Sequence, residues 1–332
     1  KFYKRDGWYW ILCPAGGVAG GWQLAMRSKS PYGPYEWKRV LERGKTTMNG
    51  PHQGGWIHTK YGEDWFIHFQ DKGPYGRVCH LQPVDWSSGW PVMGNAGEPY
   101  WKFRKPKSDS KTIVNPVETD EFDSSKLGMQ WQWQNDYKES YGQATSMGFF
   151  RLFTYALPEL GDVSNLWYVP NMLLQKTPAD EFTATTKLSF CSRNSDQYVG
   201  LVCMSAEYSS VGLQRTEDGY ELQIRHNPNA MRTHLTDEVL TVDTLKPTQK
   251  GTPRKGRPAE MHIKDVYLRM SIKDSKVNYA YSIDGKKWKK AGGEYAMGKG
   301  RWIGSKIGFF AVDPNKTGRK GFIDIDWFRI SR

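Results

Sequence analysis

Short segments in which apolar or aromatic residues alternate with polar ones recur along the whole chain of 332 residues. Early examples cover residues 8–12 and 22–28, and later ones cover residues 182–188 and 266–270. Alternation with a period of two places the apolar side chains on one face, which is typical of a half-buried β-strand. The 34 glycines and 18 prolines supply frequent turns between such segments. The pattern therefore predicts an all-β protein.

Residues 1–105 repeat one theme of short aromatic strands separated by turns. The strands are expected at residues 8–12, 22–28, 37–41, 56–59, 65–69 and 78–84. Four-stranded units repeated every 40–50 residues or so are typical of the blades of a β-propeller. Two blades cannot close a ring, and their inner edges would remain unpaired. We therefore expect residues 1–105 to be part of a propeller whose other blades lie elsewhere.

A different arrangement is expected after residues 106–116, which are rich in lysine, serine and proline and indicate a linker. From residue 117 to residue 332 short alternating strands resume, and Asp284-Gly285 marks the turn of a hairpin. Two closing strands, near residues 307–310 and 321–328, are typical of a two-sheet β-sandwich. The sequence thus predicts a partial propeller followed by a sandwich of the jelly-roll or concanavalin-like kind.

Composition narrows the range of partners. The formal net charge is +12, but the basic residues are spread along the chain. The densest basic stretch, residues 246–264, contains three prolines and indicates a loop. No helix-turn-helix, RNP-like or zinc-finger pattern is present, and no run of about 18 apolar residues could span a membrane. We expect neither nucleic acid nor a membrane as a partner.

The four cysteines stand at positions 13, 79, 191 and 203. No pair of them has the spacing of metal ligands. We therefore expect four buried free thiols that pack as small apolar side chains.

One motif indicates more than the fold class. It runs Gly50-Pro51-His52-Gln53-Gly54-Gly55-Trp56 and is followed by the strand 65–71 and by the segment 75–84. These runs resemble the later blades of the five-bladed propeller in glycoside hydrolase family 43. The runs at residues 130–133 and 171–176 resemble the concanavalin-like sandwich that accompanies many members of that family.

The resemblance implies a function. Members of the family release terminal α-L-arabinofuranosyl or β-D-xylosyl residues from oligo- or polysaccharides of plant cell walls, in one displacement with inversion. The family needs no organic cofactor, and the location expected for such an enzyme is extracytoplasmic, either periplasmic or secreted. The alternatives are a carbohydrate-binding protein without catalysis and, more remotely, a purely structural accessory module.

The resemblance also implies where the catalytic carboxylates lie. An inverting pair needs a base and an acid about 6.5–9.5 Å apart. Residues 1–10 resemble the strand that follows the Glu-Gly-Pro motif of the family's general acid, and the family's base and tuning aspartate belong to earlier blades. We therefore expect no catalytic carboxylate in residues 1–332. All of them are expected upstream of Lys1, in the missing N-terminal blades.

Residues expected to bind substrate follow from the same motifs. Arg77 resembles the family's arginine that contacts a sugar hydroxyl and the carboxylates, and the planar fork of arginine suits that role. Trp22 follows a glycine-rich loop and offers an apolar face to a sugar ring, with packing between blades as the alternative role. Gln53 is a further candidate for the same pocket. Asp71 is the nearest acid on a strand end, where capping the next turn is the alternative role.

Metal binding is expected at His52, which in the family approaches a central cation, often calcium, through water. A hard cation prefers oxygen ligands, so the expected role of His52 is to orient waters and carboxylates. In the sandwich, Glu121 and Asp326 are weaker candidates for a shared structural calcium ion.

Several other side chains are interpreted as structural. His58, His68 and His80 lie on predicted strands without a partner pattern. Trp131 and Trp133 alternate on one strand and therefore face the same side, where a sugar platform is the alternative to core packing.

Overall fold

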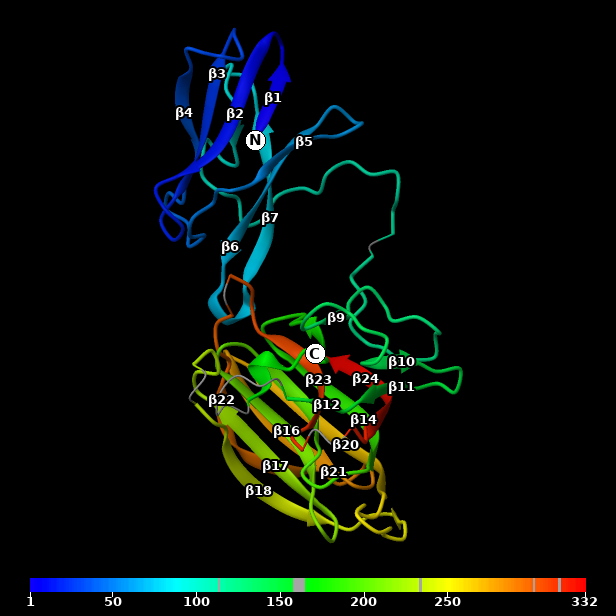
Figure 1. The fold of residues 1–332 in the computed structure, drawn as a ribbon. Helices are drawn as coiled ribbons and strands as arrows, with labels where there is room; N and C mark the ends of the chain where they lie inside the picture. Colours follow the sequence, from blue (N-terminus) through cyan, green and yellow to red (C-terminus); the bar gives the residue numbers. More distant parts are fainter. Residues whose placement is uncertain (113, 158–164, 233–234, 301, 316–317) are drawn as a thin grey trace. The chain divides into compact units, whose positions relative to one another are not determined.

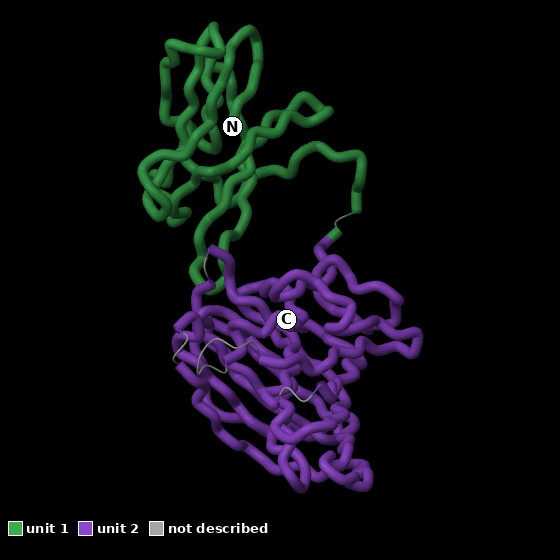
Figure 2. The backbone as a smooth tube through the Cα atoms, viewed as in Figure 1, with its two compact units in different colours: residues 1–114 green, residues 115–332 purple. Residues whose placement is uncertain are grey.

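The computed structural model describes residues 1–112, 114–157, 165–232, 235–300, 302–315 and 318–332. The chain divides into two compact units, residues 1–114 and residues 115–332 (Figure 2). The division falls inside the stretch 106–116 that the sequence indicates as a linker. No helix of the described residues has the length and apolar character needed to cross a membrane.

Unit 1 consists of two four-stranded antiparallel sheets, each in chain order, as expected for propeller blades (Figure 1). The first sheet contains β1 (Phe2–Arg5), β2 (Trp8–Ala15), β3 (Trp22–Ser28) and β4 (Glu36–Leu41). The second contains β5 (Gly55–His58), β6 (Asp64–Asp71), β7 (Arg77–Asp85) and β8 (Val92–Met93), with the 3₁₀ turn η1 (Gly73–Tyr75) between β6 and β7.

The segment 1–10 differs from the single strand that the resemblance implied. It forms β1, a tight turn and the start of β2, and the two strands pair antiparallel from Phe2–Ile11 to Arg5–Trp8. Asp6 and Gly7 make the turn with φ values of 50° and 72°. Both values lie in the left-handed region that glycine and aspartate tolerate, so these two residues reverse the chain there.

The core of unit 1 joins the two sheets. Its fully buried members come from both: Trp10, Leu12, Ala25, Val40, Leu41, Phe66 and Met93. A polar link accompanies this core, because Arg5 on β1 donates to both oxygens of Asp64 on β6 at 2.9 Å. Asp64 also accepts from the ring nitrogens of Trp56 and His58, both at 2.8 Å. His58 therefore has the structural role expected for it.

Unit 2 is a sandwich of two eight-stranded sheets. One sheet has the order β10-β11-β24-β14-β20-β21-β22, with β19 also paired to β20, and the other has the order β18-β17-β16-β15-β23-β13-β9, with β12 also paired to β23. The elements of the first sheet are β10 (Gly142–Ala144), β11 (Phe150–Phe153), β14 (Phe182–Ser192), β19 (Gln249–Lys250), β20 (Met261–Lys273), β21 (Lys276–Ser282), β22 (Lys289–Ala296) and β24 (Phe322–Ser331). Those of the second are β9 (Gln132–Trp133), β12 (Tyr155–Ala156), β13 (Leu173–Lys176), β15 (Tyr198–Met204), β16 (Tyr208–Arg215), β17 (Tyr220–Asn227), β18 (Glu238–Leu245) and β23 (Lys306–Asp313).

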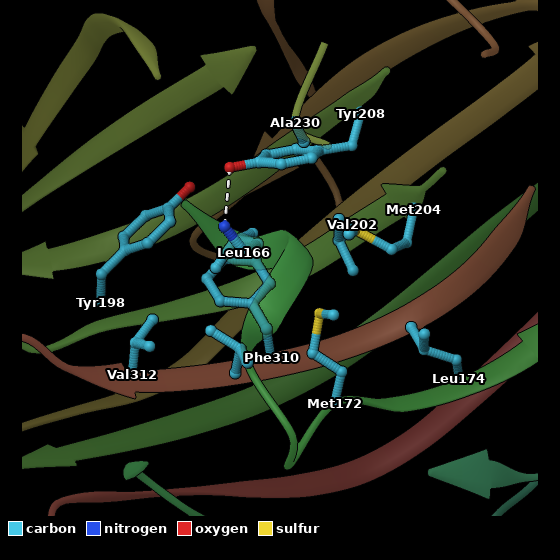
Figure 3. Packing of buried hydrophobic residues seen from close by; sticks show 11 residues of the cluster. Leu166, Met172, Leu174, Tyr198, Val202, Met204, Tyr208, Ala230, Phe310 and Val312 are labelled. Atoms are coloured by element: carbon cyan, nitrogen blue, oxygen red, sulfur yellow. Dashed lines mark hydrogen bonds between the residues drawn. The ribbon is translucent and has the colours of Figure 1, made fainter. Parts of the chain in front are cut away.

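A short 3₁₀ turn, η2 (Leu166–Tyr168), packs against one face of the second sheet. Figure 3 shows Leu166 against side chains of that sheet, among them Tyr198 and Phe310. The backbone N–H of Leu166 donates to the hydroxyl of Tyr208 at 2.9 Å, and that hydroxyl donates to Asp237. Burial raises the pKa of Tyr208 well above its ordinary value, and it also raises the pKa of Asp237.

The two tryptophans at the start of the sandwich differ in burial. Trp131 is only 8% exposed, packs against Phe309 and Phe328, and donates its ring N–H to Asp120 at 2.7 Å. Trp133 is half-buried beside Tyr141. Core packing thus accounts for Trp131, whereas Trp133 is only half-buried.

The cysteines differ in part from the expectation. All four are free. Cys191 and Cys203 are buried, but Cys13 is half-buried and Cys79 is exposed, so the prediction of four buried thiols is wrong for those two. Cys79 lies on β7, whose burial follows no strict alternation, and the period of two therefore did not reveal its exposure.

Candidate functional site

The glycine-rich loop at residues 16–21 surrounds His52. The ring Nε2 of His52 lies 2.8 Å from the carbonyl oxygen of Gly17. A Cβ atom at Gly21 would lie 2.3 Å from the Cδ2 atom of His52, which is closer than real Cβ contacts allow. In the structure the loop approaches this histidine, and the expected approach of the loop to a ligand stays a prediction. Only glycine at position 21 permits the approach to His52.

The hydrogen bond to Gly17 fixes the proton on His52. A carbonyl oxygen only accepts, so Nε2 must carry the hydrogen and donate. In the neutral ring Nδ1 then has a free lone pair. His52 is 2% exposed, and its Nδ1 is buried without a hydrogen-bond partner among the described residues. A buried unpartnered acceptor is costly, and it indicates a position where a water or another donor would be bound.

Arg77 and His52 both contact one aromatic ring. The guanidinium carbon of Arg77, at the start of β7, lies 4.4 Å from the ring centroid of Phe69 on β6. The ring of His52 contacts Phe69 edge-on, with centroids 6.2 Å apart and an angle of 89° between the ring planes. We call His52, Phe69 and Arg77 the blade-end cluster. Arg77 forms no ion pair with a described residue, so the cation–π contact leaves its donors available to a ligand.

Phe69 was missed by the sequence analysis. The alternation places it on the face opposite to Phe66, but it does not indicate which side chains meet on that face. Its position between Arg77 and His52 depends on the β6–β7 register, in which Asp71 pairs with Arg77 and Phe69 with Cys79.

Lys1 lies close to the turn that carries His52. Its carbonyl oxygen accepts from the backbone N–H of Leu12 at 2.8 Å, and its side-chain ammonium donates to the carbonyl oxygen of Gly54, two residues after His52. The catalytic carboxylates expected upstream of Lys1 belong to positions outside residues 1–332, so that expectation stays a prediction.

Asp71, the acid nearest to the blade-end cluster along the chain, caps a turn. Its Oδ1 accepts from the backbone N–H of Gly73 at 2.9 Å. Its backbone N–H donates to Oδ1 of Asn49, and its backbone carbonyl oxygen accepts from Nδ2 of Asn49, both at 3.1 Å. This arrangement is the turn-capping role that the sequence analysis gave as the alternative.

The two remaining substrate candidates lie in different surroundings. The guanidinium carbon of Arg39 lies 4.1 Å from a ring centroid of Trp22. The same ring packs against Gly16, where an added Cβ atom would lie only 2.2 Å from Cζ3 of Trp22. Gln53 is exposed, with φ at 58°, in the turn that follows His52. Trp22 therefore packs within the first sheet, whereas Gln53 is free to reach outward beside His52.

The acidic pair in the sandwich does not fit a calcium site. Both oxygens of Glu121 accept from Arg329 at 2.8 Å, and Asp326 lies 3.0 Å from the ammonium of Lys187. The bond from Arg329 lowers the pKa of Glu121. Each carboxylate is thus neutralised by a protein cation, whereas a calcium site requires several oxygens directed at one point.

A layer of polar side chains also lies on β6 and β7. Gln82 donates to Nε2 of His68 at 3.4 Å, and His68 stacks on His80 with centroids 5.5 Å apart. His80 in turn donates to Gln70 at 3.2 Å. Burial lowers the pKa of His68 to about 4, with smaller contributions from His80 and His52. His68 and His80 have the structural roles that the sequence indicates.

The pKa of His68 predicts an acid-sensitive unit 1. The folded state holds His68 neutral down to about pH 4, whereas the unfolded chain protonates it near pH 6.5. The unfolded state thus binds more protons between these values, so stability falls as pH decreases. We expect His68 to account for a loss of roughly 2–3 kcal/mol between pH 7 and pH 4. Urea unfolding followed by tryptophan fluorescence at several pH values measures this dependence.

The control for that measurement is His58→Gln, at a histidine whose side chain is 54% exposed. His68→Gln is expected to flatten the pH dependence, and His58→Gln is expected to leave most of it. Equal slopes in His68→Gln and the parent chain would contradict the assignment to His68.

Comparisons with known proteins identify the family. The profile described as "Glycosyl hydrolases family 43" matches residues 1–91. The profile described as "Beta xylosidase C-terminal Concanavalin A-like domain" matches residues 119–331. The chain belongs to glycosyl hydrolase family 43. The family resemblance and the all-β fold class predicted from the sequence are thereby confirmed.

Individual relatives agree with this assignment. A putative β-xylosidase of Xylanibacter ruminicola is 34% identical over 315 residues, covering 93% of this chain and 54% of the relative. A β-xylosidase of Formosa agariphila is 29% identical, covering 99% of this chain and 58% of the relative. This chain therefore spans little more than half the length of these two proteins.

Solved structures of the family share the fold. The crystal structure of a family 43 protein from Bacillus licheniformis matches with a TM-score of 0.80 at 24% identity, over 99% of this chain and 64% of that one. The match supports the propeller-type sheets and the sandwich together.

Proposed function

We propose that this chain is part of a glycosidase that releases terminal β-D-xylosyl or α-L-arabinofuranosyl residues from plant cell-wall glycans, with inversion. The family membership and the two relatives named as xylosidases support the reaction class. Polymeric substrates of this kind do not enter cells unaided, so we also propose an extracytoplasmic location.

The observation that carries the proposal is the blade-end cluster. Arg77 offers a planar set of donors beside the apolar ring of Phe69. A sugar presents hydroxyl acceptors around apolar C–H surfaces, so an arginine fork next to an aromatic ring suits it chemically.

Within this proposal, residues of this chain bind and orient the sugar. Arg77 would hold a sugar hydroxyl, and Phe69 would keep the guanidinium in place. An inverting reaction also needs an acid and a base about 6.5–9.5 Å apart. The proposal assigns neither carboxylate to the cluster, because Asp71 is engaged by the turn that it caps. Both are assigned to the native gene product upstream of Lys1.

A central cation fits His52 in an indirect way. The free Nδ1 lone pair can accept a hydrogen bond from a water in the cation's hydration shell, while Nε2 remains bound to Gly17. When bound, calcium would contribute positive charge that draws carboxylates and waters toward the site. The role of His52 is then to hold a water in a fixed position.

The native gene product tests the proposal directly. We expect it to release 4-nitrophenol from 4-nitrophenyl β-D-xylopyranoside, and ¹H NMR of xylobiose cleavage to show the inverted α-anomer first. The same assay with 4-nitrophenyl α-L-arabinofuranoside separates the two sugars. Binding of both sugars without turnover would overturn the proposal in favour of a carbohydrate-binding protein.

His52→Ala in the native gene product is expected to lower kcat/KM by about 10–100-fold, as for other residues that act through a bound water or ion. The midpoint of thermal unfolding is expected to change by much less than for a core substitution. Steady-state kinetics and a thermal melt of the same sample provide the two readouts. A loss of stability without a loss of activity would make His52 a packing residue.

A further inference from the structure

Three potential metal ligands lie together on one face of the sandwich. They are Cys191 near the end of β14, His262 near the start of β20, and Glu260 just before β20. Cys191 and His262 are directly paired across the two antiparallel strands. Glu260 precedes His262 by two residues, so extended backbone directs both side chains to the same side. Strand pairing therefore holds Cys191 and His262, and Glu260 directly precedes the same strand.

The distances between the ligand atoms suit one small ion. The sulfur of Cys191 lies 3.5 Å from Nε2 of His262, and that nitrogen lies 2.9 Å from Oε1 of Glu260. All three ligand atoms lie within 4.8 Å of one another. With usual zinc bond lengths, sulfur and nitrogen ligands of a tetrahedral ion are roughly 3.5 Å apart. The sulfur–nitrogen spacing already matches this value, and the carboxylate, 39% exposed, is free to move outward by a few tenths of an ångström.

Surrounding side chains orient the three groups. Arg193 donates through Nε to the other oxygen of Glu260 at 2.8 Å, which leaves Oε1 facing His262. Phe322 on β24 pairs with Cys191 from the other side, and the guanidinium of Arg151 covers its ring at 3.9 Å. Cys191 is accordingly 2% exposed, while the side chain of His262 is 29% exposed. The cluster is closed around sulfur and open to solvent beside the imidazole.

We propose that Cys191, His262 and Glu260 form a binding site for Zn²⁺ on the sandwich, with water as the fourth ligand. Thiolate and imidazole select a borderline or soft cation, and they disfavour calcium and magnesium. Binding requires two proton movements. The thiol proton of Cys191 leaves to solvent, and the ring hydrogen of His262 moves from Nε2 to Nδ1. Thiolate and carboxylate together place two negative charges beside the ion, and Oε2 of Glu260 remains paired with Arg193. Arg193 then acts as an outer-shell partner of Glu260.

The test uses the full chain in a Cys79→Ser background, because Cys79 is an exposed thiol that could bind metal by itself. After treatment with chelator and its removal, the protein is titrated with Co²⁺ and Zn²⁺. We expect one Co²⁺ per chain, with the intense visible bands of a tetrahedral site and a thiolate-to-cobalt charge-transfer band. Zinc is also expected to raise the midpoint of thermal unfolding, because it binds the folded state.

Three variants make the test specific. Cys191→Ser is expected to abolish the charge-transfer band and to weaken zinc binding by more than the roughly 10–100-fold typical of outer-shell losses. His262→Gln changes a partly exposed side chain, so the fold is expected to persist while affinity falls. Cys203→Ser, at a buried cysteine of the same unit, is the control and is expected to bind as the parent does. Absence of the cobalt bands, or bands that persist in Cys191→Ser, would overturn the proposal and leave the trio as a hydrogen-bonded network.

Discussion

Replacement of Arg77 by alanine is expected to lower kcat/KM of the native gene product on the aryl xyloside about 30–1000-fold. This corresponds to a loss of roughly 2–4 kcal/mol of transition-state stabilisation. The variant loses a charged, planar set of donors that faces a ligand, while Phe69 and the β6–β7 hairpin remain. The midpoint of thermal unfolding is expected to change little, because the guanidinium contributes no ion pair with a described residue. Initial-rate kinetics and a thermal melt on the same preparation measure both quantities.

Two further variants separate sugar binding from general surface charge. Arg104 also lies over aromatic rings, 5.6 Å from Trp65, and pairs with Glu63, so Arg104→Ala is the matched control and is expected to keep normal kinetics. Arg77→Lys retains the charge without the planar fork, and we expect it to recover only a small part of the activity. Normal kinetics in Arg77→Ala would place Arg77 at the blade surface, outside the substrate site.

Phe328→Ala is expected to reduce the free energy of unfolding of the sandwich by about 3–5 kcal/mol, the usual range for removing a buried aromatic ring. Phe328 lies on β24, is fully buried, and packs edge-on against Trp131 and Phe309 with centroids 5.3 and 5.5 Å apart. Both neighbours would border the resulting cavity. Urea unfolding followed by near-ultraviolet circular dichroism detects the change.

The control for this substitution is Ile283→Ala, since Ile283 is 63% exposed in the turn between β21 and β22. Its effect is expected to stay within about 0.5 kcal/mol, as for most surface substitutions. If the two variants had the same unfolding midpoint, Phe328 would not belong to the cooperative core of the sandwich.

The expected strands were correct because their signal is local. Alternation along residues 22–28 predicts β3, and that along residues 182–188 lies within β14, since a strand with one buried face repeats every two residues. The hairpin at Asp284-Gly285 was equally local: Gly285 has φ of 70°, and Asp284 accepts from the backbone N–H groups of Lys286 and Lys287. These bonds lower the pKa of Asp284 to about 2.

Local signals were insufficient where a residue has two credible roles. Asp71 is an acid at a strand end whether it contacts a ligand or caps a turn, and only the bond to Gly73 shows which group it engages. Glu121 and Asp326 are acidic in the sequence, but their neutralisation by Arg329 and Lys187 depends on side chains far away along the chain.

The sequence by itself determined the class of the fold, the two successive units and the family, because strand periodicity, turn residues and contiguous motifs are all properties of neighbouring residues. Tertiary structure alone decided which side chains meet. Phe69 lies between Arg77 and His52 through strand register and the path of the loop before β5. Cys191 meets His262, 71 residues later, because β20 rather than β15 pairs with β14. Sheet order depends on how two whole sheet faces bury their apolar surface together. No short stretch of sequence contains enough information to predict that order.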